Sequence, residues 1–246
     1  MTEKIVEILG VRFANTTRKQ LISTLDQHLQ LNEKQFIVTA NPEIVMKANQ
    51  DQQYMAALKQ ANYITADGIG VVKAAQMLKT PLPERVAGFE VMLDLLKLAN
   101  DKAYKVYFLG ASEETLQKTV ENVQRDYKNI NIVGSQHGFF DWEDKQIAER
   151  VVAAEPDFVF VALGAPRQEQ WITQNLASFD KGIFIGVGGS FDVLAGTVKR
   201  APVIWQKLNL EWLYRIVKQP SRLKRSLAIP QFMLKILQVK LKGTAK

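Results

Sequence analysis

The sequence contains no cysteine among its 246 residues and only two histidines, His28 and His137. The chain therefore forms no disulfide, carries no thiolate nucleophile and offers no thiolate ligand to a metal. The two histidines are far apart and have no metal-binding motif around them. We expect no metal site and no resident cofactor, and a chain without cysteine fits a reducing cytoplasm.

Long apolar runs are also missing. Glu7 interrupts the N-terminal stretch, so the continuous apolar core of about 7–15 residues that marks a signal peptide is absent. No segment reaches about 18 uncharged apolar residues, so we expect no transmembrane helix. These absences predict a cytoplasmic protein.

Several motifs of nucleotide enzymes and hydrolases do not occur. The sequence has no G-x-x-x-x-G-K-[ST], and in its two partial matches to G-x-G-x-x-G the third glycine is replaced by Lys73 and by Phe191. A nicotinamide enzyme or a P-loop NTPase is therefore disfavoured. There is no G-x-S-x-G and no D-x-D pair. If the ligand is a nucleotide sugar, arginines, lysines and helix dipoles must neutralise its diphosphate.

Positive charge is concentrated at the C-terminus. Residues 199–246 hold twelve Lys/Arg and one acid, Glu211, a net charge of +11. Because the whole chain is +7, residues 1–198 sum to −4. We therefore divide the chain into a globular domain, 1–198, and a basic appendage, 199–246, whose partner is an anionic surface or a phosphate-bearing ligand.

Short apolar runs alternate with helical patterns through residues 1–198. With 47% hydrophobic residues, a full core is expected. The pattern predicts an α/β fold: a Rossmann-like, mostly parallel six-stranded sheet with helices on both faces and an N-terminal β-hairpin around Gly10. The expected strands are 35–40, 62–66, 104–110, 129–135, 157–164 and 182–188, and the expected helices are near 16–31, 42–61, 68–79, 88–101, 112–127, 143–154, 166–178 and 201–218.

Polar residues follow the expected strands, at the edge where open α/β sheets bind ligands. Asn41 precedes Pro42 and would cap a helix, whereas Thr39 has no capping task and would face the crevice. Asp67, before Gly68, is either an N-cap or a general base. Arg85 is either a surface charge or a bidentate diphosphate ligand.

Gln168 lies in the segment GAPRQEQW, which follows another strand. It would either bind a sugar or base through its amide or belong to a solvated first helical turn. The glycine-containing turns at 110–112, 164–171 and 186–192 place backbone N–H groups at helix starts, where phosphate binds readily.

The basic appendage combines cations with apolar residues. Pro202, Pro220 and Pro230 are expected to divide it into three short helical pieces. Arg215, Lys218, Arg222 and Arg225 are spaced 3, 4 and 3, as one basic stripe or two pieces that face one target. The alternatives are a tail packed on the globule, an amphipathic membrane-associating segment, or nucleic-acid binding. The last is disfavoured because the aromatics lie on apolar faces.

The order of these motifs resembles the WecG/TagA/CpsF family of bacterial glycosyltransferases. The resemblance covers essentially the whole chain, and the basic tail is most similar to the teichoic-acid branch. The segments that carry it are TANPEIV (39–45), ADGIGVV (66–72), RVAGFE (85–90), FLGAS (108–112), GFF (138–140), GAPRQEQW (164–171), GVGGSFDVLAG (186–196) and KRAP (199–202).

The resemblance implies an inverting, metal-independent transfer of N-acetylmannosamine from UDP-ManNAc to undecaprenyl-diphosphate-GlcNAc, with a β-1,4 bond formed and UDP released. Asp67 matches the catalytic base of the family. Thr39 and Asn41 match pocket residues beside it, and Arg85 and Gln168 match residues that contact donor or product. The tail cations at 215, 218, 222 and 225 match or neighbour positions that close over the active site at the cytoplasmic face of the membrane.

Alternatives remain open at this point. Members of the family use other donors, such as UDP-ManNAcA for another surface polysaccharide. A non-catalytic anion-binding protein would explain the tail but not the polar residues at the strand ends. A sugar-nucleotide oxidoreductase lacks its dinucleotide fingerprint. A second copy of the chain, in a homo-oligomer, is kept as a candidate partner.

Overall fold

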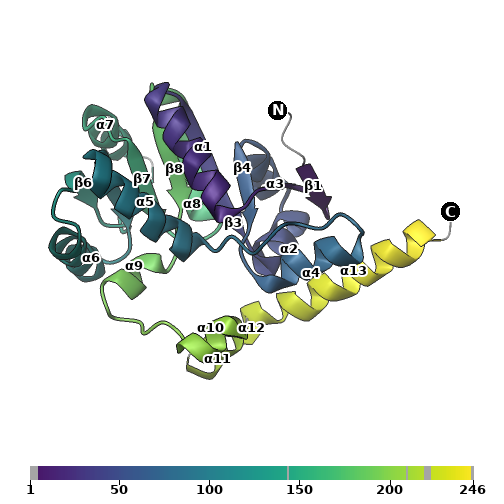
Figure 1. Ribbon diagram of the computed structural model, residues 1–246. Coiled ribbons are helices and arrows are strands. Elements are labelled where there is room, and N and C mark those ends of the chain that lie inside the picture. The colour runs from purple at the N-terminus through teal and green to yellow at the C-terminus, as the bar shows by residue number, and fades with distance from the viewer. Residues whose placement is uncertain (1–4, 143, 209, 219–222, 245–246) are drawn as a thin grey trace.

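A parallel sheet forms the centre of the molecule (Figure 1). The computed structural model describes residues 5–142, 144–208, 210–218 and 223–244. The predicted parallel sheet of six strands is confirmed, and its strands stand in the order β4-β3-β8-β7-β5-β6. Their bounds are β3 Lys34–Ala40, β4 Tyr63–Ala66, β5 Lys105–Gly110, β6 Asn131–Gln136, β7 Phe158–Ala162 and β8 Gly182–Gly186.

Both faces of the sheet are buried, which explains why the central strands read as continuous apolar runs. In β7, Phe158 and Phe160 point to one core layer, and Val159 and Val161 point to the other. The first layer is covered by helices α1 Arg18–Gln30, α5 Gly88–Lys102 and α6 Glu113–Asp126. The second is covered by α2 Pro42–Gln50, α3 Gln52–Lys59, α4 Ile69–Met77, α7 Lys145–Ala153 and α8 Arg167–Asn175.

The expected N-terminal hairpin is confirmed. Strands β1 (Ile5–Ile8) and β2 (Val11–Ala14) pair antiparallel around Gly10, and β2 packs beside the edge strand β4. Gly10 has φ +79°, a left-handed conformation that a tight hairpin turn requires and that glycine adopts without strain.

Two expected helices are divided in the structure. The segment 42–61 forms α2 and α3 because the Asp51 side chain accepts hydrogen bonds from the backbone N–H groups of Gln53 and Tyr54 and starts a new helix. The segment 201–218 forms α10 (Val203–Lys207) and α11 (Glu211–Lys218). A short 3₁₀ turn, Leu176–Ser178, follows α8, and a short helix, α9 (Ser190–Leu194), follows β8.

The appendage continues with α12 (Leu223–Ser226) and α13 (Ala228–Thr244). The expectation that Pro230 separates two helices is wrong, because Pro230 lies in the first turn of α13. There the missing N–H of proline removes no intrahelical hydrogen bond. Pro220 lies outside the described residues.

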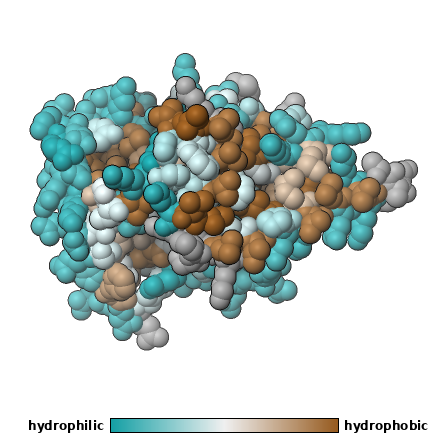
Figure 2. Space-filling model, turned by 90° about the horizontal axis from the view of Figure 1, so that it is seen from below, coloured by the Kyte–Doolittle hydropathy of each residue, from teal (hydrophilic) through white to brown (hydrophobic). Residues whose placement is uncertain are grey.

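Helix α13 is anchored to the globule rather than detached from it. Phe232 and Ile236 are fully buried in the core layer that contains α2 and α4, and α13 runs beside these two helices (Figure 1). Seen from the side of the C-terminal helices, apolar residues gather in patches on the surface (Figure 2). Among the described residues, no helix is both long and apolar enough to cross a membrane.

Candidate functional site

Asp67 lies at the carboxyl end of the edge strand β4, where its backbone N–H donates to the carbonyl of Ala40 at 2.9 Å. Its Oδ2 accepts a hydrogen bond from the backbone N–H of Gly88, the first residue of α5, at 3.2 Å. Asp67 does not cap α4, whose N-cap is Gly68. The positive end of the α5 dipole stabilises the carboxylate instead, and the side chain is only partly buried.

Thr39 lies beside this contact on the neighbouring strand. The register of β3 and β4 pairs Thr39 with Thr65, one step before Ala40 pairs with Ala66. Gly88 packs directly on Thr39, since a Cβ at position 88 would lie 2.5 Å from Thr39 Oγ1. Glycine is thus required for α5 to begin this close to β3, and the hydroxyl of Thr39 borders the Asp67 site.

Asn41 acts as a helix cap in this structure. Its Oδ1 accepts a hydrogen bond from the Ile44 N–H at 3.0 Å, at the start of α2, with Pro42 in the first helical position. The capping interpretation of Asn41 is confirmed, and its predicted ligand contact remains a prediction.

Arg85 is held at the same sheet edge by backbone contacts. The next residue, Val86, donates its N–H to the carbonyl of Ala66 at 2.9 Å, so this segment follows the end of β4. The guanidinium of Arg85 pairs with Glu90 Oε1 at 3.3 Å and with Glu211 Oε2 at 3.5 Å. A surface-charge interpretation does not fit a side chain that is 19% exposed and pairs with two carboxylates.

Glu90, in the first turn of α5, is the centre of a larger ion-pair network. Arg18 of α1 approaches its Oε2 at 3.3 Å, and Arg200 approaches its Oε1 at 2.7 Å. Arg18 also pairs with Asp94 at 3.0 Å. Arg200 also faces Glu211 at 3.5 Å and lies 5.1 Å from the Phe89 ring centroid. The appendage therefore contacts the globular domain through charge as well as apolar packing.

Gln168 is not a member of this ion-pair network. It packs against the turn that follows β8. Its Nε2 donates to Glu169 Oε1 at 2.7 Å, and its Oε1 accepts from the Gly188 N–H at 3.0 Å. The side chain is buried, and a Cβ at Gly186 would lie 2.4 Å from its Nε2. Gln168 supports the turn 186–188, and its contact with donor or product remains a prediction.

Glu169 is buried beside Gln168 and is a residue that the sequence did not single out. Removal from water raises the pKa of its carboxyl, while hydrogen bonds from Gln168 and Tyr54 act in the opposite direction. Burial also raises the pKa of Tyr54, with the Glu169 charge as the next cause. Burial thus favours the uncharged form of both Glu169 and Tyr54. The pair packs next to Gln168, which contacts the turn after β8.

The predicted tail cations are distributed over separate helices. Arg215 and Lys218 belong to α11, and Arg225 belongs to α12; Arg222 lies outside the described residues. The Lys218 side chain is exposed. Because α11 begins with Glu211 beside Arg85, the tail lies next to the edge that carries Asp67.

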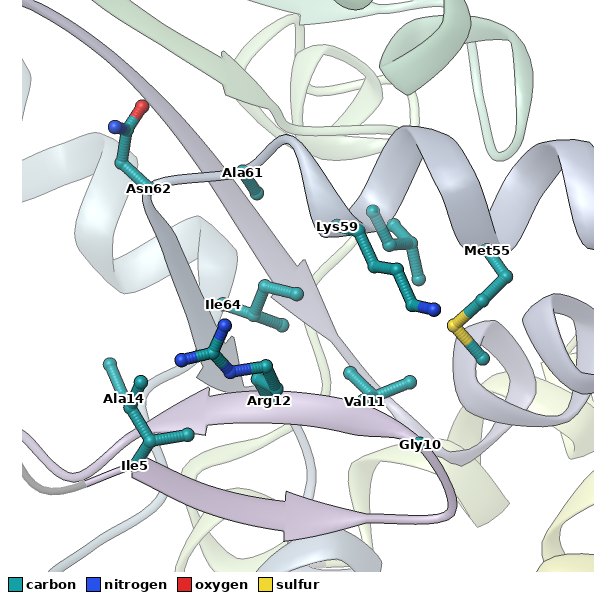
Figure 3. A pocket seen from close by; sticks show the side chains of 11 residues that line it. Ile5, Gly10, Val11, Arg12, Ala14, Met55, Lys59, Ala61, Asn62 and Ile64 are labelled. Carbon is teal, nitrogen blue, oxygen red and sulfur yellow. The ribbon is translucent and has the colours of Figure 1, made fainter.

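A separate hollow of about 120 Å³ lies between the hairpin and the amino end of β4 (Figure 3). Its wall contains none of the predicted site residues. The residues that line it are Ile5, Gly10, Val11, Arg12, Ala14, Met55, Leu58, Lys59, Ala61, Asn62 and Ile64.

The geometry thus assembles Thr39, Asp67 and Arg85 at one sheet edge and adds Arg200 and Glu211, which sequence reasoning did not assign. A signal for Glu211 existed, since it is the one acid of the basic segment. Such an edge can hold a hydroxyl against a carboxylate and an anion against arginines. In the described part of the chain, no three acidic or histidine side chains gather in a way that could hold a metal ion.

Comparisons with known proteins identify the family of the chain. The model of the glycosyl transferase WecG/TagA/CpsF family matches residues 6–246. An N-acetylglucosaminyldiphosphoundecaprenol N-acetyl-beta-D-mannosaminyltransferase of Staphylococcus aureus strain MW2 is 44% identical over 239 residues, which cover 96% of this chain and 94% of the relative. The proteins of the same name from strains NCTC 8325 and COL match with the same identity and coverage.

Proposed function

The chain belongs to the WecG/TagA/CpsF family of glycosyltransferases, and from this membership we propose that it transfers N-acetylmannosamine from UDP-ManNAc to undecaprenyl-diphosphate-GlcNAc. The reaction is inverting, forms a β-1,4 bond, releases UDP and serves the teichoic-acid linkage unit. The names of the Staphylococcus aureus relatives support the acceptor and the transferred sugar.

The observation that carries the proposal is the placement of Asp67. Its carboxylate is oriented by the Gly88 N–H at the start of α5, beside Thr39 and the segment that bears Arg85. In the proposed step, Asp67 accepts the proton of the GlcNAc 4-hydroxyl, the oxygen attacks the anomeric carbon, and the bond from that carbon to UDP breaks. The helix N-terminus orients the base before the substrate arrives.

The leaving diphosphate carries the charge that must be neutralised. Arg85 lies three residues before Gly88, so its Cα is within about 11 Å of the residue that holds Asp67. An arginine at this position can bind phosphate oxygens bidentately. We assign Thr39 and Asn41 to the pocket beside the base, and Gln168 to the donor side through its turn.

The acceptor is a membrane lipid, so the proposal places the enzyme on the cytoplasmic face of the membrane as a peripheral protein. Residues 199–246 are the membrane-associating part, and residues 1–198 are the catalytic part. We assign to Arg215, Lys218, Arg222 and Arg225 the attraction to the anionic lipid surface, to which each cation contributes about 1 kcal/mol.

The direct test is UDP release from UDP-ManNAc in the presence of a GlcNAc-diphospho-lipid. We expect release that depends on the acceptor. The Asp67→Asn variant should lose about 10²- to 10⁴-fold in turnover, because the amide cannot accept the proton, and should bind UDP-ManNAc as the unmodified protein does.

Asp126→Asn is the matched control, since Asp126 ends α6 and pairs with the exposed Arg125. Unchanged turnover in Asp67→Asn would remove Asp67 as the base. Release from UDP-ManNAcA alone would support the alternative donor, and no release from any UDP-sugar would overturn the proposed function.

A further inference from the structure

The longest ion pairs in the network around Arg85 are those of Glu211. Glu211 faces Arg85 and Arg200 at 3.5 Å each, whereas Arg200 binds Glu90 at 2.7 Å. Charge-assisted N–H···O bonds are usually about 2.7–2.9 Å long. The Nε of Arg200 is buried and makes no hydrogen bond within the described chain. The N···O distances from Glu211 to the two arginines are therefore longer than those of strong ion pairs.

Glu90 holds the two arginines close together. Arg85 Nη2 and Arg200 Nη2 lie 3.3 and 2.7 Å from the same oxygen, Glu90 Oε1, so they are at most the sum, 6.0 Å, apart. Arg85 Nη1 also donates to Glu211 Oε2 at 3.5 Å, and Arg200 Nε lies 3.5 Å from Glu211 Oε1 without a hydrogen bond in the described part of the chain. Two linked phosphate groups present several oxygens over this span and can bind both forks.

The charge balance indicates what would replace Glu211. The ion pairs given above join Arg18, Arg85 and Arg200 to Glu90, Asp94 and Glu211. If Glu211 moves away, these three arginines keep only Glu90 and Asp94 from this set, an excess of one positive charge at a partly buried place, which favours entry of an anion. A diphosphate offers more charge and more acceptors than one carboxylate.

We propose that Arg200, together with Arg85, binds the diphosphate of a substrate, and that Glu211 occupies these arginines until the diphosphate displaces it. Arg200 is thus a further substrate-binding residue, and Glu211 is an internal competitor that holds the start of α11 against the two arginines. Binding of the diphosphate releases the start of α11. The inference rests on the proposed function for the identity of the substrate, but not for the anion chemistry.

The test is calorimetric binding of inorganic pyrophosphate to the full chain, without sugar or membrane. Arg200→Gln should weaken binding about 10-fold or more, because a charge-assisted pair is lost. Glu211→Gln should tighten binding several-fold in the unmodified background and have little effect in the Arg200→Gln background. Arg125→Gln, an exposed arginine of α6, is the matched control and should bind as the unmodified protein does.

Thermal melting identifies any variant that fails to fold, and Arg200→Lys then provides a second test, since it keeps the charge but loses the fork. UDP and farnesyl diphosphate are titrated in parallel. If UDP loses more affinity in Arg200→Gln, the site binds the donor diphosphate, and if farnesyl diphosphate loses more, it binds the lipid diphosphate. Equal pyrophosphate affinity in the unmodified protein, Arg200→Gln and Glu211→Gln would overturn the inference. Loss of affinity in Arg200→Gln without turnover of UDP-ManNAc would support the anion site and count against the proposed donor alone.

Discussion

At the scale of single residues, Glu169 shows how a carboxyl can serve a site without facing it. Its Oε1 accepts a hydrogen bond from the side-chain N–H of Gln168, and the Oε1 of Gln168 accepts one from the Gly188 N–H. This order fixes the orientation of the Gln168 amide, because one end must donate and the other must accept. The turn after β8 therefore depends on a buried acid that has no place in the proposed chemistry.

The buried acid predicts a pH dependence of stability. Burial raises the folded-state pKa of Glu169 above its ordinary value of 4.5, so the folded protein binds this proton more tightly than the unfolded chain does. The contribution of the protonated carboxyl is complete below about pH 4.5 and is lost as pH rises through the folded-state pKa. Each pH unit between the two pKa values is worth about 1.4 kcal/mol.

Glu169→Gln removes this titration, since the amide is neutral at every pH. We expect the free energy of unfolding of the variant, relative to the unmodified protein, to increase from about pH 4.5 upward, as measured by urea unfolding across pH. Glu121→Gln, at an exposed position of α6, should give a curve parallel to that of the unmodified protein. Parallel curves for Glu169→Gln as well would show that Glu169 titrates as an ordinary carboxyl.

Single residues also differ in whether their place in the site could be predicted from the sequence. Thr39, Asp67 and Arg85 could be predicted because each follows a recognisable strand or precedes a helix. Glu169 could not, since its neighbours in GAPRQEQW look like a solvated first turn. Its burial depends on Tyr54, which is more than a hundred positions away in the sequence. The Arg85–Glu211 contact likewise joins residues 126 positions apart, and only the isolated acid in a basic segment indicated it.

At the scale of elements, the strands were predictable and the helix divisions were less so. All six strands of the sheet occur near the expected places. In five of them burial on both faces leaves an apolar run, whereas the edge strand β6 has no buried residue. The division between α2 and α3 depends on the cap made by Asp51, and α13 continues through Pro230 because that residue falls in a first turn. Helix ends of this kind depend on one or two hydrogen bonds, which the spacing of apolar residues in the sequence does not reveal.

Helix α13 yields a prediction about stability. Phe232 is fully buried against the layer of α2 and α4, whereas Leu234, two positions later, is 59% exposed. Phe232→Ala should lower the free energy of unfolding by about 3–5 kcal/mol, and Leu234→Ala should change it by less than about 0.5 kcal/mol. Chemical denaturation checks both. Equal, small effects would indicate that α13 does not stabilise the globule.

At the scale of the whole molecule, the division of charge at Lys199 coincides with a division of surface. The C-terminal helices expose large apolar side chains in the same segment that carries the excess cations. Monomeric proteins rarely expose contiguous apolar area on this scale without a partner. Figure 2 shows the apolar patches on this face. Apolar area and excess cations in one segment are the two attractions that would hold an amphipathic segment on an anionic bilayer.

Vesicle binding tests this view of the appendage. Ile204 and Leu208 lie one helical turn apart at α10 and are 64% and 61% exposed. We expect the full chain to sediment with vesicles that contain phosphatidylglycerol, less so at high salt. The double variant Ile204→Glu, Leu208→Glu should bind at least about tenfold more weakly. It replaces apolar side chains that would enter the bilayer with carboxylates that the anionic lipids repel.

Leu31→Glu is the control for that experiment. Leu31 is 68% exposed, as open as the two tail residues, but it ends α1, before the strand β3 begins. It lies at the amino end of the sheet, on the opposite side from Asp67 and the tail. Its variant should sediment with vesicles as the unmodified protein does. If Leu31→Glu weakens binding as much as the double variant, the chain associates with lipid through general hydrophobicity, and the appendage is not its membrane-binding surface.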